Sequence, residues 1–267
     1  MELTVDNVSK SYPAAKGDTR LALAETSVTI AQGEFICVVG PSGCGKSTML
    51  MIMAGLLAPT GGQVRLDGTL VTGPPAGLSV VFQDYGRSLF PWMNVRRNLA
   101  IAGKAAGLSR AETAERVREA LAAVGLDGVE NLYPWQMSGG MQQRTAIARA
   151  LVVRPEVMLM DEPFAAVDAQ TRADLEDLVL RVRHEYQMTV VFVTHDIDEA
   201  VYLGDRVLVM RANPGHLVSD VRVDLPRPRD QVSTKLDPRF AQLRSEIFRQ
   251  VMRSVETTAP PLAPTFP

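Results

Sequence analysis

Cysteine is scarce in this sequence of 267 residues, which contains two, Cys37 and Cys44. Two cysteines make neither a disulfide framework nor a metal-binding constellation. Cys37 falls inside an apolar run, whereas Cys44 falls inside a glycine-rich loop. This usage fits a reducing cytosol. We expect Cys44 to be the thiol that reagents reach, because its loop must be open to solvent when it holds no ligand.

Strong net charge and long apolar runs are also missing. The formal net charge is -2, and no cluster of five or more Lys and Arg residues interrupts the chain, so nothing suggests an electrostatic surface for nucleic acid. No apolar run approaches the ~18 residues of a membrane helix, and the N-terminus has no basic region followed by an apolar stretch. We therefore expect a soluble chain without a nucleic-acid partner. Its hydrophobic content of 46% is ample for a core.

The most specific motif is a glycine-rich loop that matches the phosphate-binding pattern of a Gly, four free positions and Gly-Lys-Ser. An apolar run precedes it at 35–39 and another follows at 49–57, which predicts a strand, the loop and a helix in the required order. A glycine-rich turn that happens to contain a lysine is disfavoured by this context. The candidate nucleotide-binding residues are Gly40, Pro41, Ser42, Gly43, Cys44, Gly45, Lys46, Ser47 and Thr48.

Each residue type in this loop suits phosphate chemistry. The glycines let the backbone curl, so that successive N–H groups and the helix N-terminus point at phosphate oxygens. Lys46 adds a positive charge for the β and γ phosphates, and Ser47 offers a hydroxyl to Mg²⁺, which prefers oxygen ligands.

Three further polar residues follow apolar, strand-like runs. Asp161 and Glu162 come after 157–160, so two carboxylates lie where a parallel strand meets the ligand crevice. His195 follows 190–193, on a strand that should neighbour the first. Gln83 follows 79–82, which we also expect to be a buried strand. For Asp161 and Glu162 the alternative is a polar strand end that enters a loop. For His195 the alternative is a structural role. Gln83 alone does not predict a function.

The remaining segments predict a mixed α/β chain. Alternating residues at 3–5, 27–30 and 63–66 indicate strands of an N-terminal antiparallel sheet. Tyr12 lies among them, and from this residue alone surface packing is favoured over stacking on a base. Residues 89–93, Leu-Phe-Pro-Trp-Met, form either an exposed docking patch or a buried plug, and the two remain equally open.

Several helices are marked by their ends. Ser109 and Glu112 make a capping box before Ala114, Val117, Leu121 and Val124 recur on one face. A second helix begins near Ser138-Gly139-Gly140, whose glycines could expose N–H donors to an anion. Further helices are predicted at 171–186, at 196–204 with Asp196 and Glu199 as a capping pair, and from Asp237 with Phe240, Leu243, Ile247 and Val251 on one face. Residues 206–210 suggest another strand, and 226–229 a linker.

Together these pieces closely resemble the ATP-binding subunit of ABC transporters over roughly residues 3–222, because Ser138-Gly139-Gly140-Met141-Gln142-Gln143-Arg144 looks like the family signature. The resemblance implies an α/β fold: a P-loop NTPase core with a mixed, mainly parallel sheet, an N-terminal antiparallel β subdomain and an inserted α-helical subdomain at about 84–153. Residues 1–222 would form the ATPase domain. Residues 223–267 would form an extension with one helix and a proline-rich tail, 257–267, which we expect to be disordered.

The resemblance also implies roles for single residues. Tyr12 would stack on adenine, and Gln83 would be the Q-loop glutamine, binding Mg²⁺ with Ser47 and Asp161. Lys46, Glu162 and His195 would be catalytic, with Glu162 polarising the attacking water and His195 as the switch histidine. Two copies would sandwich two ATP molecules, each held by one copy's phosphate loop and by Ser138, Gly139, Gly140 and Met141 of the other, with Asp168 in the D-loop. Met137, Met141 and Ala165-Ala166-Val167 depart from the common family pattern.

Segments 89–92, 192–196 and 226–229 resemble the nitrate, sulfonate and taurine importers. This implies an ATP-hydrolysing subunit that powers import through membrane permease subunits, is peripheral at the cytoplasmic face of the inner membrane, and works indirectly with a solute-binding protein. The alternative is a non-transport ABC ATPase that acts on nucleic acid or ribosomes, but its coiled-coil insertion or tandem nucleotide domains are not present. A GTPase or small-molecule kinase would leave the segment at Ser138 unexplained. The sequence does not identify the solute.

Overall fold

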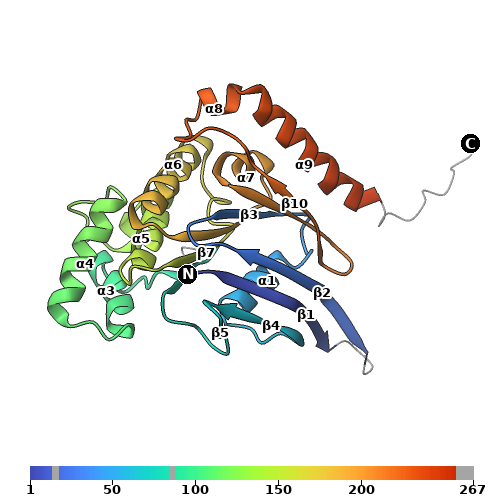
Figure 1. Cartoon of the computed structure of the whole chain (residues 1–267). Coiled ribbons are helices and arrows are strands. Elements are labelled where there is room, and N and C mark those ends of the chain that lie inside the picture. Colours follow the sequence, from blue (N-terminus) through green and yellow to red (C-terminus); the bar gives the residue numbers. More distant parts are fainter. Residues whose placement is uncertain (14–17, 84–87, 257–267) are drawn as a thin grey trace, which may run out of the picture.

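The computed structural model describes residues 1–13, 18–83 and 88–256. Its strands form two sheets (Figure 1). The smaller sheet has the order β2-β1-β4-β5, and each of its pairs is antiparallel. Its strands are β1 (Leu3–Pro13), β2 (Thr19–Ile30), β4 (Gly61–Leu66) and β5 (Thr69–Leu70). This is the expected N-terminal antiparallel unit.

The larger sheet has the order β10-β9-β3-β8-β7-β6. Every pair in it is parallel except β10 with β9. The strands are β3 (Phe35–Val39), β6 (Leu78–Val81), β7 (Val157–Asp161), β8 (Thr189–Val193), β9 (Arg206–Arg211) and β10 (His216–Arg222). The predicted fold, with its mixed and mainly parallel sheet, is therefore confirmed.

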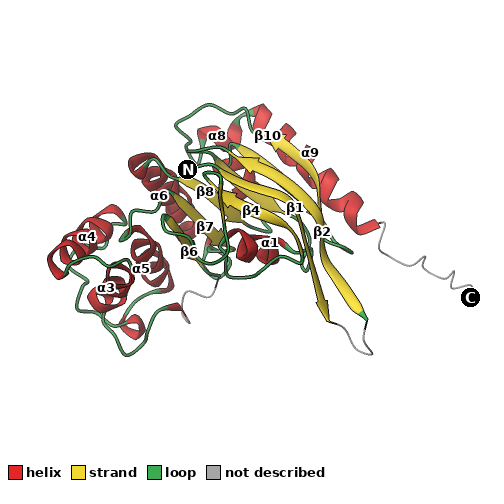
Figure 2. Cartoon of the chain, turned by 60° about the horizontal axis from the view of Figure 1, so that its bottom comes forward, coloured by secondary structure: helices red, strands yellow, loops and turns green. Residues whose placement is uncertain are grey.

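Burial explains why the central strands read as continuous apolar runs. All five residues of β3, of β7 and of β8 are buried, as expected for parallel strands covered on both faces. In β3, Phe35 and Cys37 face one apolar cluster, whereas Ile36 and Val38 face another. The second cluster also contains residues of helix α1 (Lys46–Met53), which lies between the two sheets (Figures 1 and 2).

Two expected elements differ from the structure. The helix predicted over 49–57 begins earlier, at Lys46, and ends before Gly55, whose φ is +68°. A side chain there would not fit, because a Cβ on Gly55 would lie 2.2 Å from the carbonyl oxygen of Gly73. The strand predicted over 79–82 is an edge strand, β6, and Val81 is its one fully buried residue. β6 is less buried than β7 and β8 because it has a neighbouring strand on one side only.

Helices α3, α4 and α5 pack together beside the larger sheet (green to yellow-green in Figure 1), and α5 also contacts β6 and α6. The Ser109 capping box is present at the start of α4. However, Ala114 is exposed, and Thr113 is buried in its place. Thr113 packs against Gly103 of α3, where an added Cβ would lie 2.7 Å from its side chain. The prediction is therefore wrong at Ala114 alone, since Val117, Leu121 and Val124 are buried as expected. The helices are α3 (Val95–Ala105), α4 (Arg110–Ala123) and α5 (Gly139–Leu151).

The remaining α-helices cover the face of the larger sheet opposite α1, or follow the sheet in the chain. They are α6 (Ala169–Tyr186), α7 (Ile197–Leu203), α8 (Ser233–Leu236) and α9 (Pro238–Glu256). Helix α9 packs on α7 and β9 (Figure 1), and its Phe240, Leu243 and Ile247 join the same buried cluster as Phe192 of β8. Within the described residues, no helix combines the length and apolar character needed to cross a bilayer. The predicted tail, 257–267, lies outside the described residues.

Candidate nucleotide-binding and catalytic site

The glycine-rich loop joins β3 to α1, in the order that the sequence predicts. Gly45 is the residue before α1; its φ is +94°, and no side chain caps the helix. The first N–H groups of α1 are therefore left for an external acceptor, which is the arrangement that binds anions. Gly40 is required for a different reason, since a Cβ there would lie 2.5 Å from the carbonyl oxygen of Met210 on β9.

A cavity of about 390 Å³ opens beside this loop. Its lining brings together residues from five regions of the chain, including the expected Gln83 and Glu162. Its other lining residues are Arg20, Leu21, Ala22, Ser42, Gly43, Gly45, Lys46, Ser47, Thr48, Asn213, Pro214 and Gly215. Neither 20–22 nor 213–215 was predicted from the sequence. In the sequence, Gly215 is the residue that could have indicated the second segment, because a Cβ there would lie 2.2 Å from the carbonyl oxygen of Cys44.

Lys46 lines the cavity and is buried, with 6% of its surface exposed. Its Nζ donates to the carbonyl oxygens of Gly40, at 2.9 Å, and Pro41, at 3.2 Å. The same Nζ lies 3.9 Å from Oε1 of Glu162. The loop itself therefore holds the ammonium group in place, at the entrance to a helix N-terminus that already favours negative charge.

Ser47 and Asp161 meet on the next side of the site, where the Ser47 hydroxyl donates to Oδ1 of Asp161 at 3.0 Å. Burial raises the pKa of Asp161; the Ser47 bond opposes this effect, while the charge of Glu162 adds to it. A buried carboxylate beside a hydroxyl, with the Gln83 amide on the same cavity, is an oxygen donor set that fits Mg²⁺. A divalent cation there would also offset the cost of the ionised Asp161.

Glu162 and His195 come together because β7 and β8 are adjacent and parallel. Oε2 of Glu162 lies 3.0 Å from Nδ1 of His195. The Glu162 N–H donates to the carbonyl oxygen of Val193 at 2.9 Å, and its φ of +41° turns the chain out of the strand. This turn places the carboxylate between His195 and Lys46, as a candidate base beside a phosphate-binding loop.

Comparison with known proteins agrees with this geometry. The family model described as ABC transporter matches residues 23–165. This chain belongs to the ABC transporter family. A nitrate import ATP-binding protein of Synechococcus elongatus is 45% identical over 247 residues, which cover 91% of this chain and 89% of that protein. A bicarbonate transport ATP-binding protein of Synechocystis is 43% identical over 246 residues, covering 91% of this chain and 86% of that protein.

A solved structure extends the likeness to the fold. The dimeric ATP-binding cassette MJ0796, in a post-hydrolysis state bound to ADP and Pi, superposes with a TM-score of 0.71 at 32% identity, covering 83% of this chain and 98% of that one. The chain is thus an ABC-type ATPase with a nucleotide-binding site.

In this ABC ATPase, the expected signature lies outside the cavity. Ser138 precedes α5, and its hydroxyl oxygen accepts from the Met141 N–H at 3.3 Å. None of Ser138, Gly139, Gly140 and Met141 lines the cavity. Asp168 likewise lies elsewhere, capping α6 through the Thr171 N–H at 3.0 Å and the Thr171 hydroxyl at 2.7 Å. Tyr12 is 39% exposed with Lys10 Nζ 5.4 Å from its ring centre, and it does not line the cavity either.

The expectation that Cys44 is an accessible thiol is wrong. Cys44 is fully buried in the cluster between the sheets, and burial raises the pKa of its thiol despite the opposing charge of Lys46. The loop is open through its backbone, while this side chain points inward. Cys37 is also buried, as expected, and its thiol pKa is raised. Both thiols are therefore poor nucleophiles in the folded protein.

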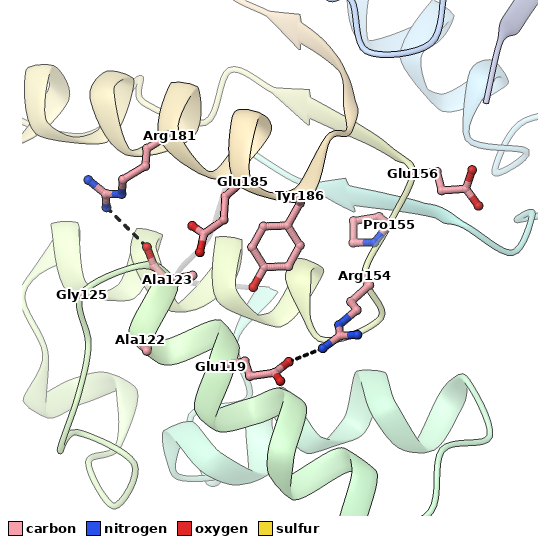
Figure 3. Close-up of a pocket in the computed structure, with 10 residues that line it drawn as sticks. All are labelled: Glu119, Ala122, Ala123, Gly125, Arg154, Pro155, Glu156, Arg181, Glu185 and Tyr186. Carbon is pink, nitrogen blue, oxygen red and sulfur yellow. Dashed lines mark hydrogen bonds and ion pairs between the residues drawn. The ribbon is translucent and has the colours of Figure 1, made fainter.

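A second cavity, of about 790 Å³, lies between α4 and the C-terminal end of α6 (Figure 3). Arg154 donates to Glu119 at 2.7 Å, and Arg181 donates to the carbonyl oxygen of Ala123 at 3.3 Å. These two hydrogen bonds connect α4 to the core beside this cavity. Tyr186 points into it (Figure 3). No residue that the sequence predicts for the site lines it. The smaller cavity at the phosphate loop is the candidate active site.

Proposed function

We propose that this ABC ATPase hydrolyses ATP to power import of a small solute, such as nitrate, bicarbonate, a sulfonate or taurine, through membrane permease subunits. One observation supports the chemistry best: Lys46, Glu162 and His195 converge at an uncapped helix N-terminus, beside the Ser47–Asp161 pair. Nitrate and bicarbonate are taken from the names of the relatives, and sulfonate and taurine from the sequence resemblance.

In this proposal, the loop residues 40–48 bind the phosphates of ATP through backbone N–H groups and Lys46. Ser47, Asp161 and Gln83 would hold Mg²⁺, which when bound neutralises charge developing on the phosphates. Tyr12 would stack on the adenine. Its ring is exposed enough to receive a base. It lies near the end of β1 and pairs with Arg20 of β2, the strand that supplies residues 20–22 to the cavity.

Glu162 accepts a proton from the attacking water in this mechanism. Its two oxygens have separate neighbours, since Oε1 faces Lys46 Nζ at 3.9 Å and Oε2 faces His195 Nδ1 at 3.0 Å. Contacts on both sides orient the carboxylate before the reaction, which is what a general base needs. His195, at the end of β8, would then contact the γ-phosphate as the switch histidine.

The partner that completes each site is a second copy of the chain. Ser138, Gly139, Gly140 and Met141 would contact the ATP bound to the other copy, and Asp168 would lie at the same interface. Two observations support this: the signature does not reach its own cavity, and the Ser138 hydroxyl, although it accepts from Met141, keeps its hydrogen free to donate.

The permease would dock on the aromatic segment after Gln83. The structure divides the two alternatives for this segment, since Leu89 is buried at 1% exposure whereas Phe90 is 36% and Trp92 is 68% exposed. The buried Asn98 holds the segment, accepting from the Phe90 N–H at 2.8 Å and donating to its carbonyl oxygen at 3.2 Å. A fixed, exposed aromatic pair suits a protein anchor. Docked there, the subunit would be peripheral at the cytoplasmic face of the membrane, with a solute-binding protein acting indirectly.

Glu162→Gln tests the proposed chemistry. The amide keeps the shape of the side chain but cannot take a proton from water, so we expect ATP binding to persist while kcat falls by about 10²–10⁴-fold. The matched control is Glu185→Gln, on the wall of the second cavity, which should hydrolyse ATP like the parent. A Glu162→Gln protein with kcat within about threefold of the parent would remove Glu162 from the role of base.

A further inference from the structure

The ring of His195 is only weakly held by its own contacts. Its side chain is 61% exposed, and its contact within the described residues is the one from Nδ1 to Glu162, at 3.0 Å. An exposed ring is not kept in one position by packing. The backbone on either side of it must therefore determine where it points.

Thr194 fixes that backbone with three hydrogen bonds. Its N–H donates to the carbonyl oxygen of Val38 on β3 at 3.1 Å. Its hydroxyl oxygen accepts from the Asp196 N–H at 3.0 Å, and its hydroxyl hydrogen is donated to Oε2 of Glu199 at 2.5 Å. The hydroxyl, on the residue before His195, thus bonds to two residues that follow it. Since Thr194 is 2% exposed, water does not compete for these bonds.

Glu199 is an acid on α7 with 5% of its surface exposed. The sequence predicts it as a capping partner of Asp196, but its side chain instead turns inward to Thr194. Its other oxygen, Oε1, lies 3.5 Å from Nε of Arg172 on α6. Burial raises the pKa of Glu199 to about 7; the Thr194 bond and Arg172 lower it, while Asp196 and Glu176 raise it.

The charges around Glu199 come from several elements. Glu176 of α6 is itself buried, and it accepts from Gln231 Nε2 at 3.0 Å and pairs with Lys235 Nζ at 3.5 Å. Two residues of the C-terminal segment therefore compensate the acid that stands behind Glu199. The other titratable groups on packed elements are Cys37 of β3, whose pKa Glu199 helps to raise, and the Asp198–Arg244 pair of α7 and α9 at 2.8 Å.

We propose that Glu199 is a positioning residue for His195 and acts through the hydroxyl of Thr194. The carboxylate holds the hydroxyl, the hydroxyl holds the Asp196 N–H, and His195 lies between these two anchors. Arg172 contacts the other oxygen of this carboxylate and favours its ionised form. The inference rests on the proposed function, because it gives His195 a task in ATP hydrolysis.

Two substitutions of Thr194 separate positioning from packing. Thr194→Val removes both hydroxyl bonds and keeps the shape of the side chain, whereas Thr194→Ser keeps the hydroxyl. We expect Val to lower kcat by about tenfold, the equivalent of one lost bond to a charged group, with the KM for ATP little changed. Val should also lower the melting temperature, because it leaves the buried Glu199 carboxylate without this donor, whereas Ser should not. Ser should keep kcat within about twofold of the parent.

Glu199→Gln adds a pH readout. The amide resembles the protonated acid, so its effect should be largest where the parent is ionised, above the pKa of about 7. The ratio of parent kcat to variant kcat should therefore fall when both are measured at decreasing pH through this value. A ratio that stays constant across this range would mean that the charge of Glu199 plays no part, and would overturn the proposal.

The position of His195 can also be followed without turnover. The chain has three histidines, so loss of one imidazole NMR signal in His195→Asn identifies its ring. That signal should shift or broaden in Thr194→Val and stay in place in Thr194→Ser. If the His195 signal and kcat are both unchanged in Thr194→Val, the proposal is overturned. It is also overturned if Thr194→Ser loses as much kcat and as much melting temperature as Thr194→Val. A parent without ATPase activity would overturn the proposed function instead, and the NMR comparison would still test the anchor.

Discussion

Two helices of this protein begin at glycine-rich segments, and they begin differently. Gly45, before α1, has a φ of +94° and leaves the helix without a side-chain cap. Ser138, before α5, has an extended conformation and accepts from the Met141 N–H at 3.3 Å. The first helix therefore offers free N–H donors, whereas the second has satisfied one of its own and offers a hydroxyl hydrogen.

The acids near the two helices also differ, in the direction in which their pKa values are shifted. Burial raises the pKa of Asp161 beside α1, whereas hydrogen bonds from Thr171 lower the pKa of Asp168, which caps α6 beside α5. The phosphate-loop region thus contains groups that a phosphate and a cation would satisfy. The signature region has one N–H satisfied by its own serine and still offers a hydroxyl hydrogen, so it suits a ligand that another molecule also holds.

The largest expected effect tests whether the two regions serve one site across two copies. Lys46→Ala and Ser138→Arg should each reduce ATPase activity by at least about 10²-fold as homodimers, because each removes donors to the phosphates. A mixed dimer keeps one intact pair, the Lys46 loop of one chain and the Ser138 segment of the other. Mixing the two inactive proteins should therefore restore activity. If heterodimers form and no activity returns, the two regions do not share a site.

A second experiment tests the packing of the signature helix. A Cβ on Gly140 would lie 2.6 Å from Cγ2 of Thr171, so Gly140→Ala should destabilise the fold by about 1–3 kcal/mol. Thr171→Ser removes that methyl group and retains the hydroxyl that bonds Asp168 at 2.7 Å. The double variant should recover most of the loss in thermal unfolding. Failure to recover would show that Gly140 is needed for backbone freedom and not for contact with α6.

The smallest expected effect is on the stability of the nucleotide-free protein when Asp161 or Asp168 is replaced. Because the folded pKa of Asp161 is raised, its stabilising contribution is full only below the unfolded pKa and falls as pH rises through the folded value. Asp161→Asn should therefore raise the melting temperature at pH 7, by about 1–3 °C. The pKa of Asp168 is lowered, so its contribution is full above the unfolded pKa and is lost as pH falls. Asp168→Asn should slightly lower the melting temperature at pH 7, and shifts of the same sign would contradict the contrast.

Much of the core was predictable, because its strands are covered on both faces. The runs that became β3, β7 and β8 are apolar throughout, and the loop pattern fixes which end of β3 carries the phosphates. Helix α3 and strand β10 were missed. Helix α3 begins at the capping Asn94 but contains Gly103, which weakens the helical signal. Strand β10 is a half-exposed edge with no continuous apolar run. The division at residue 222 remains a prediction, although α9 shares the core of the sheet.

The candidate site was predictable where a motif stands in one stretch. The loop and the strand ends at Asp161 and His195 could be read directly, and the structure brings them together. The direction of the Cys44 side chain could not, because a loop pattern does not tell which face a residue presents. Gly215 and its neighbours enter the site through contacts with Ala22, on a distant strand. Glu199 was read as a cap because only its local neighbours were visible in the sequence.

Glu162 has a left-handed backbone, with a φ of +41°, where glycine would be at ease. A laboratory selection for heat resistance alone should therefore favour Glu162→Gly, since glycine relieves a strained turn and removes a carboxylate from beside Asp161. The same exchange would discard the candidate base. If Glu162 is the base, the pressures on folding and on turnover act in opposite directions at this position, and a library screened only for stability would enrich inactive proteins.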